Sequence, residues 1–188
     1  MAVTDGNDIM KFAKRSIALL ATLLALSACK MFDKEEPPLC PRVSALADSV
    51  SVTKFRPGAG RDAADVAMRA EMTSFHGSCH YDPETQQMNI TLQVGIDAER
   101  RAAMAGRNAD VFYYVAIPAF RPDPRAKQIM PVALNFPSDS DHLHYVDNEV
   151  QIAIPMPNFK ELAKYEVFVG LQLTPEELAY NRQHKDEK

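Results

Sequence analysis

Alternation of apolar and polar residues is the feature that most restricts how this chain can fold. From residue 88 to residue 96 every second side chain is apolar, and polar or small residues stand between them: Met88, Ile90, Leu92, Val94 and Ile96. Because successive side chains of a strand point to opposite faces, this segment is predicted to be a β-strand with one buried face. The same period recurs from Val43 onward, interrupted by clusters of Gly, Pro, Asp and Asn. That pattern is typical of an all-β domain.

A second strand, with a change of register inside it, is predicted just upstream. Its apolar side chains take even positions up to Met72 and odd positions from Phe75. A slip of one residue exchanges the two faces of a strand, so we expect a β-bulge between Met72 and Phe75 that turns Cys79 inward. Asp82-Pro83-Glu84-Thr85 suits a type I turn, which predicts an antiparallel hairpin with the strand at 88–96.

Three further segments are predicted to be strands in different positions of a sheet. Residues 111–120 are apolar at nearly every position, as expected for a strand that is buried on both faces or ends under a covering loop, and we expect it to be central. Residues 127–136 alternate, but Pro131 has no amide donor, which places this strand at an edge. The alternation from Tyr165 to Leu173 predicts the last strand.

Residues 142–154 are predicted to form two short strands joined by a tight turn. Segments 142–146 and 149–154 flank Asp147-Asn148, whose residues tolerate left-handed backbone angles. In that register the apolar residues of both segments face the same side, and His142 and His144 stay outside.

Short helices are predicted at two places. Asn158, followed by Glu161, resembles a capping box that starts a helix over residues 159–164. Thr174-Pro175-Glu176-Glu177 predicts a terminal helix through Tyr180, followed by a disordered charged tail at 183–188. Residues 98–105 are predicted to be another single helix or a loop.

Together these segments predict one β-sandwich domain over residues 43–182. We expect about seven to eight antiparallel strands, with one or two short helices, in an immunoglobulin- or fibronectin-like arrangement. The chain has no Trp, whereas true immunoglobulin domains carry a buried one, so the likeness is architectural. Architecture alone does not assign a function.

The N-terminal segment has the order of a secretory signal. Residues 16–26 form an apolar stretch that is too short to cross a bilayer as a helix, and three basic residues precede it: Lys11, Lys14 and Arg15. The string Leu26-Ser27-Ala28-Cys29 follows and resembles the lipobox of bacterial lipoproteins. This resemblance implies a signal peptide over residues 1–28. Since Asp5 and Asp8 are unusual ahead of a signal, we expect translation to start at Met10.

The lipoprotein resemblance implies a lipid anchor and a location. Cys29 would carry the acyl chains and become the first residue, and residues 29–42 would form an extended, Pro-containing tether. Lys30 stands where, in the lipoprotein sorting rule, Asp retains a protein at the inner membrane. We therefore expect anchoring in the outer membrane, facing the periplasm. Strings such as Cys40-Pro41-Arg42-Val43 and Gln172-Leu173-Thr174-Pro175-Glu176 also resemble uncharacterised lipoproteins of α-proteobacteria, a family with no assigned activity.

The chain has three cysteines, and lipidation of Cys29 would leave two. In an oxidising compartment the remaining pair, Cys40 and Cys79, is expected to form a disulfide. The alternative is a reactive or metal-binding thiol at Cys79.

Charge excludes one class of partner. The formal net charge of the chain is −4, and loss of residues 1–28, with three basic and two acidic residues, makes it −5. Nucleic acid binding requires a concentrated basic face, which this sequence lacks. The acyl chains would supply the membrane contact, and no cofactor is predicted.

Histidines offer the sharpest chemical alternative. His142 and His144 project from one strand face, and His76 and His80 flank Cys79, so zinc or copper could be bound if a third ligand approached. Exposed histidines near strand ends are nevertheless common on solvated faces, and we assign no metal.

Two other groups of residues are candidate functional sites. Ser74 or Ser78, His76 or His80, and Asp82 would supply the residue types of a hydrolytic triad, but no nucleophile-elbow pattern accompanies the serines. The Pro-rich loop with Arg121 and Arg125 is a predicted contact site for a partner, because rigid loops on sandwiches often carry recognition.

The sequence thus predicts a non-enzymatic binding or scaffolding module of the cell envelope, with an envelope protein as its partner. A small-ligand or metal-binding lipoprotein that uses His142 and His144 is the alternative. An envelope hydrolase is the third reading.

Overall fold

The computed structural model describes residues 40–58, 60–157 and 164–184. Cys29, the rest of the predicted leader and most of the tether lie outside these residues. The helix predicted at 159–164 also lies outside them, apart from Lys164.

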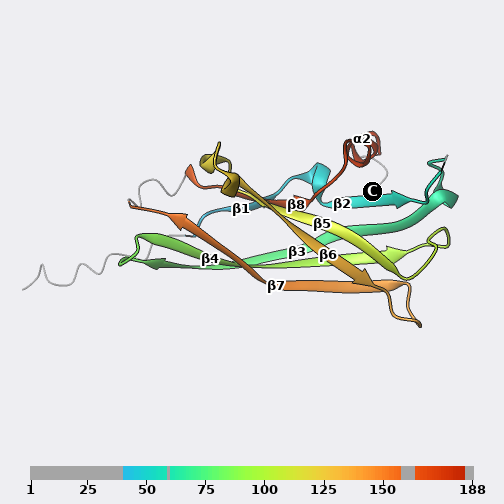
Figure 1. Ribbon diagram of the computed structural model, residues 1–188, viewed down its shortest axis with the longest axis horizontal. Coiled ribbons are helices and arrows are strands. Elements are labelled where there is room, and N and C mark those ends of the chain that lie inside the picture. The colour runs from blue at the N-terminus through green and yellow to red at the C-terminus, as the bar shows by residue number, and fades with distance from the viewer. Residues whose placement is uncertain (1–39, 59, 158–163, 185–188) are drawn as a thin grey trace, which may run out of the picture. The chain divides into compact units, whose positions relative to one another are not determined.

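Eight strands in two four-stranded sheets make up most of the described chain (Figure 1). Sheet A has the order β1 (Val43–Ala45), β8 (Val167–Leu171), β5 (Asn108–Ala116), β6 (Lys127–Asn135). Sheet B has the order β2 (Ser51–Phe55), β3 (Val66–Asp82), β4 (Gln87–Arg100), β7 (His142–Pro155). Within the described ranges there is one α-helix, α2 (Pro175–Gln183). This arrangement is consistent with the predicted β-sandwich.

The core lies where the apolar faces of the two sheets meet. Its fully buried side chains come from strands of both sheets and include Leu92, Ile96, Val111, Leu134 and Leu171. Burial of a side chain of this size contributes about 1.5–3 kcal/mol, so these alternating positions are the main source of stability.

The predicted β3–β4 hairpin and its bulge are confirmed. β3 and β4 pair in antiparallel register, and the register shifts between Met72 and Ser74. Beyond the shift, Cys79 packs against the core, as the change of parity predicted. Asp82 shapes the turn, since its carboxylate accepts hydrogen bonds from Thr85 Oγ1 at 2.8 Å and from the Glu84 amide at 2.9 Å. These bonds lower the pKa of Asp82.

β7 corrects the prediction of two strands joined by a turn at Asp147-Asn148. It is one continuous strand that pairs with β4 along its length. The register shifts where Leu92 pairs with Val150 and Val94 pairs with Asp147, so Asn148 and Glu149 form a bulge. A bulge changes the parity of apolar positions, and the strand continues because it pairs with β4 on both sides of the bulge.

β5 and β6 confirm the predicted central and edge positions. β5 lies between β8 and β6, but it ends at Ala116, and Pro118–Phe120 form a 3-10 turn, so the strand predicted to Phe120 was too long. The Phe136 amide bonds to Arg107 O, so even-numbered amides of β6 face β5. Pro131 therefore lacks its donor on the open side, where it hinders pairing with another strand.

Three other expectations need correction. β1 pairs with β8 in parallel, so the sandwich is not purely antiparallel. Residues 98–100 continue β4, and residues 101–105 form a loop, so of the two alternatives for 98–105 the loop holds for its second part. α2 extends to Gln183, and His184 caps it, so the predicted disordered tail begins too early.

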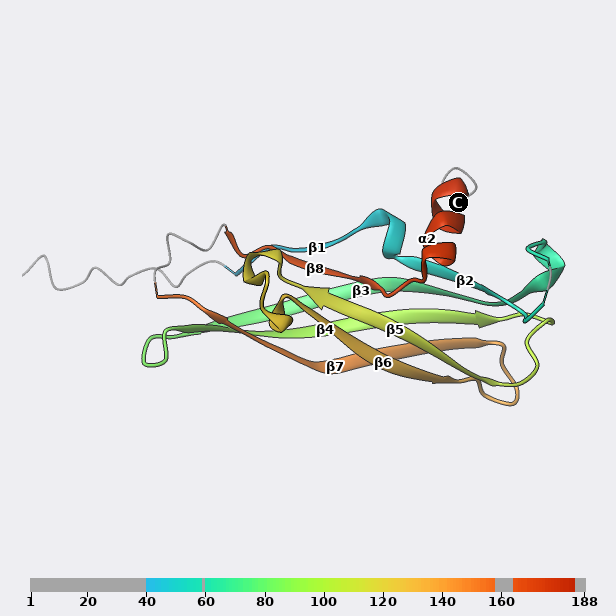
Figure 2. The ribbon, with the colours of Figure 1, turned by 45° about the horizontal axis from the view of Figure 1, so that its top comes forward.

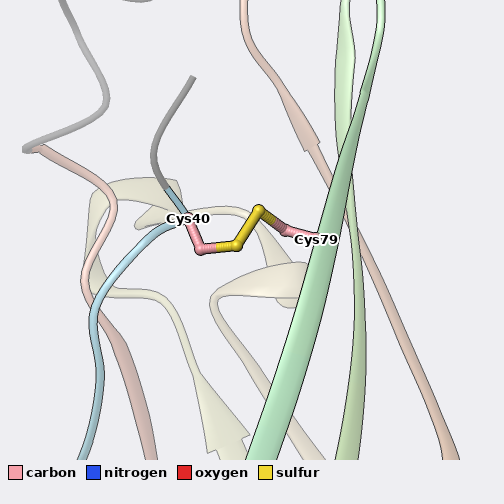
Figure 3. The surroundings of a disulfide bond; sticks show 2 residues. All are labelled: Cys40 and Cys79. Atoms are coloured by element: carbon pink, nitrogen blue, oxygen red, sulfur yellow. A yellow bond between two sulfur atoms is a disulfide. The ribbon is translucent and has the colours of Figure 1, made fainter. Parts of the chain in front are cut away.

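The predicted disulfide between Cys40 and Cys79 is present (Figure 3). Cys40 directly precedes the β1 segment of sheet A, and Cys79 lies in β3 of sheet B, with 5.6 Å between their Cα atoms. The bond therefore joins the two sheets and attaches the start of the domain to its longest strand.

A partly buried hydrogen bond also joins the two sheets. Tyr113 of β5 donates its hydroxyl proton to Asp147 Oδ2 at 2.6 Å, and the β7 bulge aims this carboxylate inward. Burial is the main cause that raises the pKa of Tyr113, and the bond to Asp147 raises it further. The neutral phenol is thus part of the folded structure.

Alkaline pH is expected to destabilise the fold through Tyr113. Because its folded pKa lies above the unfolded value of about 10, this contribution is complete below about pH 10 and is lost as pH rises further. Urea unfolding of the wild type and of Tyr113→Phe between pH 8 and pH 11 measures it. We expect the variant to be about 1 kcal/mol less stable at pH 8 and to lose less stability with pH. Equal losses in both proteins would contradict this account.

Candidate functional site

A groove of about 620 Å³ lies on the outer face of sheet B, next to helix α2. Figure 2 shows α2 beside β2, at the end of the domain away from the β3–β4 turn. The groove takes side chains from all four strands of sheet B and from the helix: Ser51, Thr53, Arg69, Glu71, Asp97, Glu99, His142, Tyr180, Asn181 and His184.

The strand register orders the groove floor into two rows, which end on β7 at His142, which lines the groove, and at His144, which lies outside its lining. The first row crosses sheet B as Ser51, Glu71, Asp97 and His144, each paired with the next. The second row crosses it as Thr53, Arg69, Glu99 and His142. In β2, β3 and β4 the members have the parity opposite to the buried residues of their strand. In β7, before its bulge, His142 and His144 alternate with Leu143 and Tyr145, which pack against the core, so both rows face solvent.

Helix α2 forms one wall of the groove and is fixed by local sequence and by the edge of β2. Thr174 and Glu177 form the predicted capping box, with Pro175 in the first turn. The buried Asn181 donates from Nδ2 to Asp48 O at 3.0 Å and to Ser51 O at 2.7 Å. These two bonds hold the helix at the edge of sheet B.

Aromatic side chains line this wall. Tyr180 packs edge-on against Phe55 with 5.1 Å between ring centroids, and it stacks on His184 at 4.1 Å. Lys54 pairs with Glu177 at 3.4 Å on the neighbouring surface. The ring of Tyr180 is therefore held at the groove by contacts on both sides.

The charges of the groove are unevenly compensated. Glu99 pairs with Arg101 at 2.6 Å and also lies opposite Arg69. Glu71 and Asp97, in contrast, are like charges on directly opposite positions, an arrangement that destabilises a sheet. Asp97 contacts His144 Nδ1 on its other side. Among the described residues Glu71 forms no ion pair, whereas Asp97 and Glu99 each have a partner.

The structure separates the four histidines that are candidate metal ligands in the sequence. All lie on the outer face of sheet B, but His76 pairs with Gln93 and His80 with Asn89, whereas His144 pairs with Asp97. Four residues along β4 correspond to about 13 Å. Within the described residues, no group of three or more His, Cys, Asp or Glu side chains is placed to hold a metal ion. Cys79, in its disulfide, is not a free thiol.

The candidate residues of a hydrolytic triad lie on β3, in the half that leads to the turn. Asp82 is occupied by the hydrogen bonds of that turn. Among the described residues of β3, no hydrogen bond joins a serine hydroxyl to a histidine. The segment therefore lacks the contacts between nucleophile, base and orienting acid that such chemistry requires.

The loop with Arg121 and Arg125 is built around an internal ion pair. Arg125 binds Asp123 through Nη2 at 2.9 Å and Nε at 3.0 Å, and its guanidinium lies over the Phe120 ring. These bonds lower the pKa of Asp123 and raise that of Arg125. Arg125 thus stabilises the loop, whereas Arg121 is exposed to solvent.

The groove was missed from sequence because its members come from distant segments. No short motif joins β2, β3, β4, β7 and α2, and the order of the strands cannot be read from local alternation. A partial signal was present, since acidic residues occupy outward positions of two strands: Glu71, Asp97 and Glu99.

Comparisons with protein-family models, curated proteins and solved structures found no match for this chain. In the part of the chain that the structure describes, no helix is long and apolar enough to span a membrane.

Proposed function

We propose that this protein is a lipoprotein of the bacterial envelope, anchored through Cys29 in the outer membrane and facing the periplasm, whose β-sandwich binds a protein partner. The groove on sheet B is the observation that carries the binding role. It is concave and lined by polar groups from five elements, as expected of a binding site. Its chemistry is that of recognition, and we propose no catalytic reaction for it.

The position of the groove supports presentation to a partner. The chain joins the sandwich at Cys40, which the disulfide fixes to Cys79. Glu71 lies eight residues before Cys79 in β3, which corresponds to about 26 Å along the strand. The groove therefore lies far along β3 from the disulfide, which leaves room for a partner.

A small ligand is the second candidate occupant. His142 lines the groove, and a volume of about 620 Å³ lies in the range of ligand sites. His142 and the carboxylates beside it would then bind the ligand. This corresponds to the small-ligand function predicted from the sequence, without a metal ion.

The likeness to immunoglobulin and fibronectin domains is proposed for architecture only. Immunoglobulin sheets have the strand orders ABED and CFG. Sheet B instead holds three consecutive strands, β2, β3 and β4, followed by β7. We draw no function from this likeness.

Filling the groove tests the proposal. Thr53→Trp places a bulky side chain on the groove floor, and Ala133→Trp places the same side chain on an exposed position of β6 in sheet A. After chemical crosslinking in cells, partner recovery with the tagged protein is expected to fall about tenfold or more for Thr53→Trp and to stay unchanged for Ala133→Trp. Equal recovery from both variants would contradict a binding role for the groove.

A further inference from the structure

We infer that the groove on sheet B binds a basic segment of the protein partner, with a lysine or arginine side chain held between Glu71 and Asp97. The inference rests on the proposed function and specifies the chemistry of its partner. The pair of carboxylates, the aromatic wall and the lack of large apolar residues in the groove carry it.

The carboxylate pair supplies the charge. Glu71 and Asp97 occupy opposite positions of the β3–β4 ladder, where Cβ atoms are about 4.5–5.5 Å apart. Both side chains are exposed, and none of the described cations forms an ion pair with Glu71. A cation between them would remove the repulsion and gain two charge-assisted hydrogen bonds.

Within the described residues, neither Arg69 nor Arg101 forms an ion pair with Glu71 or Asp97. Arg69 lies in the second row opposite Glu99, and Arg101 already pairs with Glu99. Glu99 pairs with Arg101 and Asp97 contacts His144, so among the described groove carboxylates Glu71 is the one without an ion pair. On this row His144 is the neighbouring basic group, in contact with Asp97.

The helix wall adds a contact that favours a basic side chain. Tyr180 lines the groove and is held by Phe55 and His184. Since His184 stacks on the Tyr180 ring, the ring contributes apolar surface that can cover the methylenes of a lysine or arginine side chain. A lysine- or arginine-containing segment would use both walls of the groove at once.

Other partner chemistries fit less well. An acidic segment or a phosphate would meet Glu71 and Asp97 and be repelled. An apolar segment would leave Glu71 without a partner, and the large exposed apolar side chains of the described residues lie outside the groove: Leu46, Phe112, Ile129 and Val146. The groove is open and crosses several strands, so it suits an extended segment.

The test measures binding of a fluorescent octalysine peptide to the full chain, purified in non-ionic detergent. The groove variant carries Glu71→Gln and Asp97→Asn, and the control variant carries Glu84→Gln and Asp110→Asn, which are exposed acids at the β3–β4 turn and on β5. Both variants change the net charge by the same amount. We expect affinity to fall about tenfold for the groove variant and less than about twofold for the control. Thermal unfolding verifies that both variants fold.

Two outcomes would overturn the inference. Equal weakening in both variants would mean that octalysine responds to overall charge. Absence of octalysine binding by the wild type, while Thr53→Trp still loses its partner in cells, would reject a basic segment and leave the proposed function intact. If Thr53→Trp also keeps its partner, the proposed function fails as well.

Discussion

Replacing both Cys40 and Cys79 by serine is expected to lower the free energy of unfolding by about 4 kcal/mol. The two residues are 39 positions apart, so the disulfide restricts a long loop of the unfolded chain. In the folded state β1, with three residues, is the shortest strand and an edge strand, so little else holds the start of the domain. Denaturant unfolding of the oxidised wild type and of the double variant measures the difference.

The control for this prediction is Cys29→Ser, which leaves the disulfide intact and should unfold like the wild type. Wild-type protein unfolded in the presence of reductant should match the double variant. A loss below about 1 kcal/mol would show that the disulfide contributes little to stability and that β1 is held by other contacts.

Replacing Cys29 by serine is expected to release the protein from the membrane. Each buried methylene contributes about 0.8 kcal/mol, so two or three acyl chains produce a persistent anchor that serine cannot carry. Cell fractionation and labelling with a palmitate analogue measure the effect. We expect nearly complete loss of label and of membrane association.

The disulfide variant provides the matched control for lipidation. Cys40→Ser combined with Cys79→Ser removes two thiols and should still incorporate the palmitate analogue. Retention of label or of membrane association by Cys29→Ser would contradict the assignment of the lipid to this residue.

Local patterns predicted the elements whose causes are local. The turn at Asp82 and the cap at Thr174 were predicted correctly because each depends on hydrogen bonds within a few residues. The alternation of β4 and the position of Pro131 at an edge were also predicted, since side-chain parity and a missing amide do not depend on distant partners. Such features can be read from a single sequence.

The two changes in the parity of apolar positions show what local sequence patterns cannot predict, namely whether the change is a bulge or a turn. At Met72 and at Asp147 the apolar positions switch between odd and even, and both switches are bulges in the structure. A turn was predicted at Asp147-Asn148 because these residues also suit a tight loop. The deciding factor was β4, which pairs with β7 on both sides of the switch, and pairing with a distant strand leaves no local signal.

The groove shows the same limit for function. Its rows depend on the order β2-β3-β4-β7 and on the exact register of each pair. A displacement of β3 by one residue would turn Glu71 toward the core. Sequence reasoning found His142 and His144 individually, and it could not place them beside carboxylates from β4.

The groove can be tested most directly by photocrosslinking in living cells. A photoreactive amino acid at position 53 of the groove is predicted to capture one defined envelope protein, and the same amino acid at position 133 on sheet A should not capture it. The double substitution Glu71→Gln and Asp97→Asn is also expected to reduce the crosslink from position 53. Capture of the same protein from position 133 but not from position 53 would contradict the assignment of the binding site.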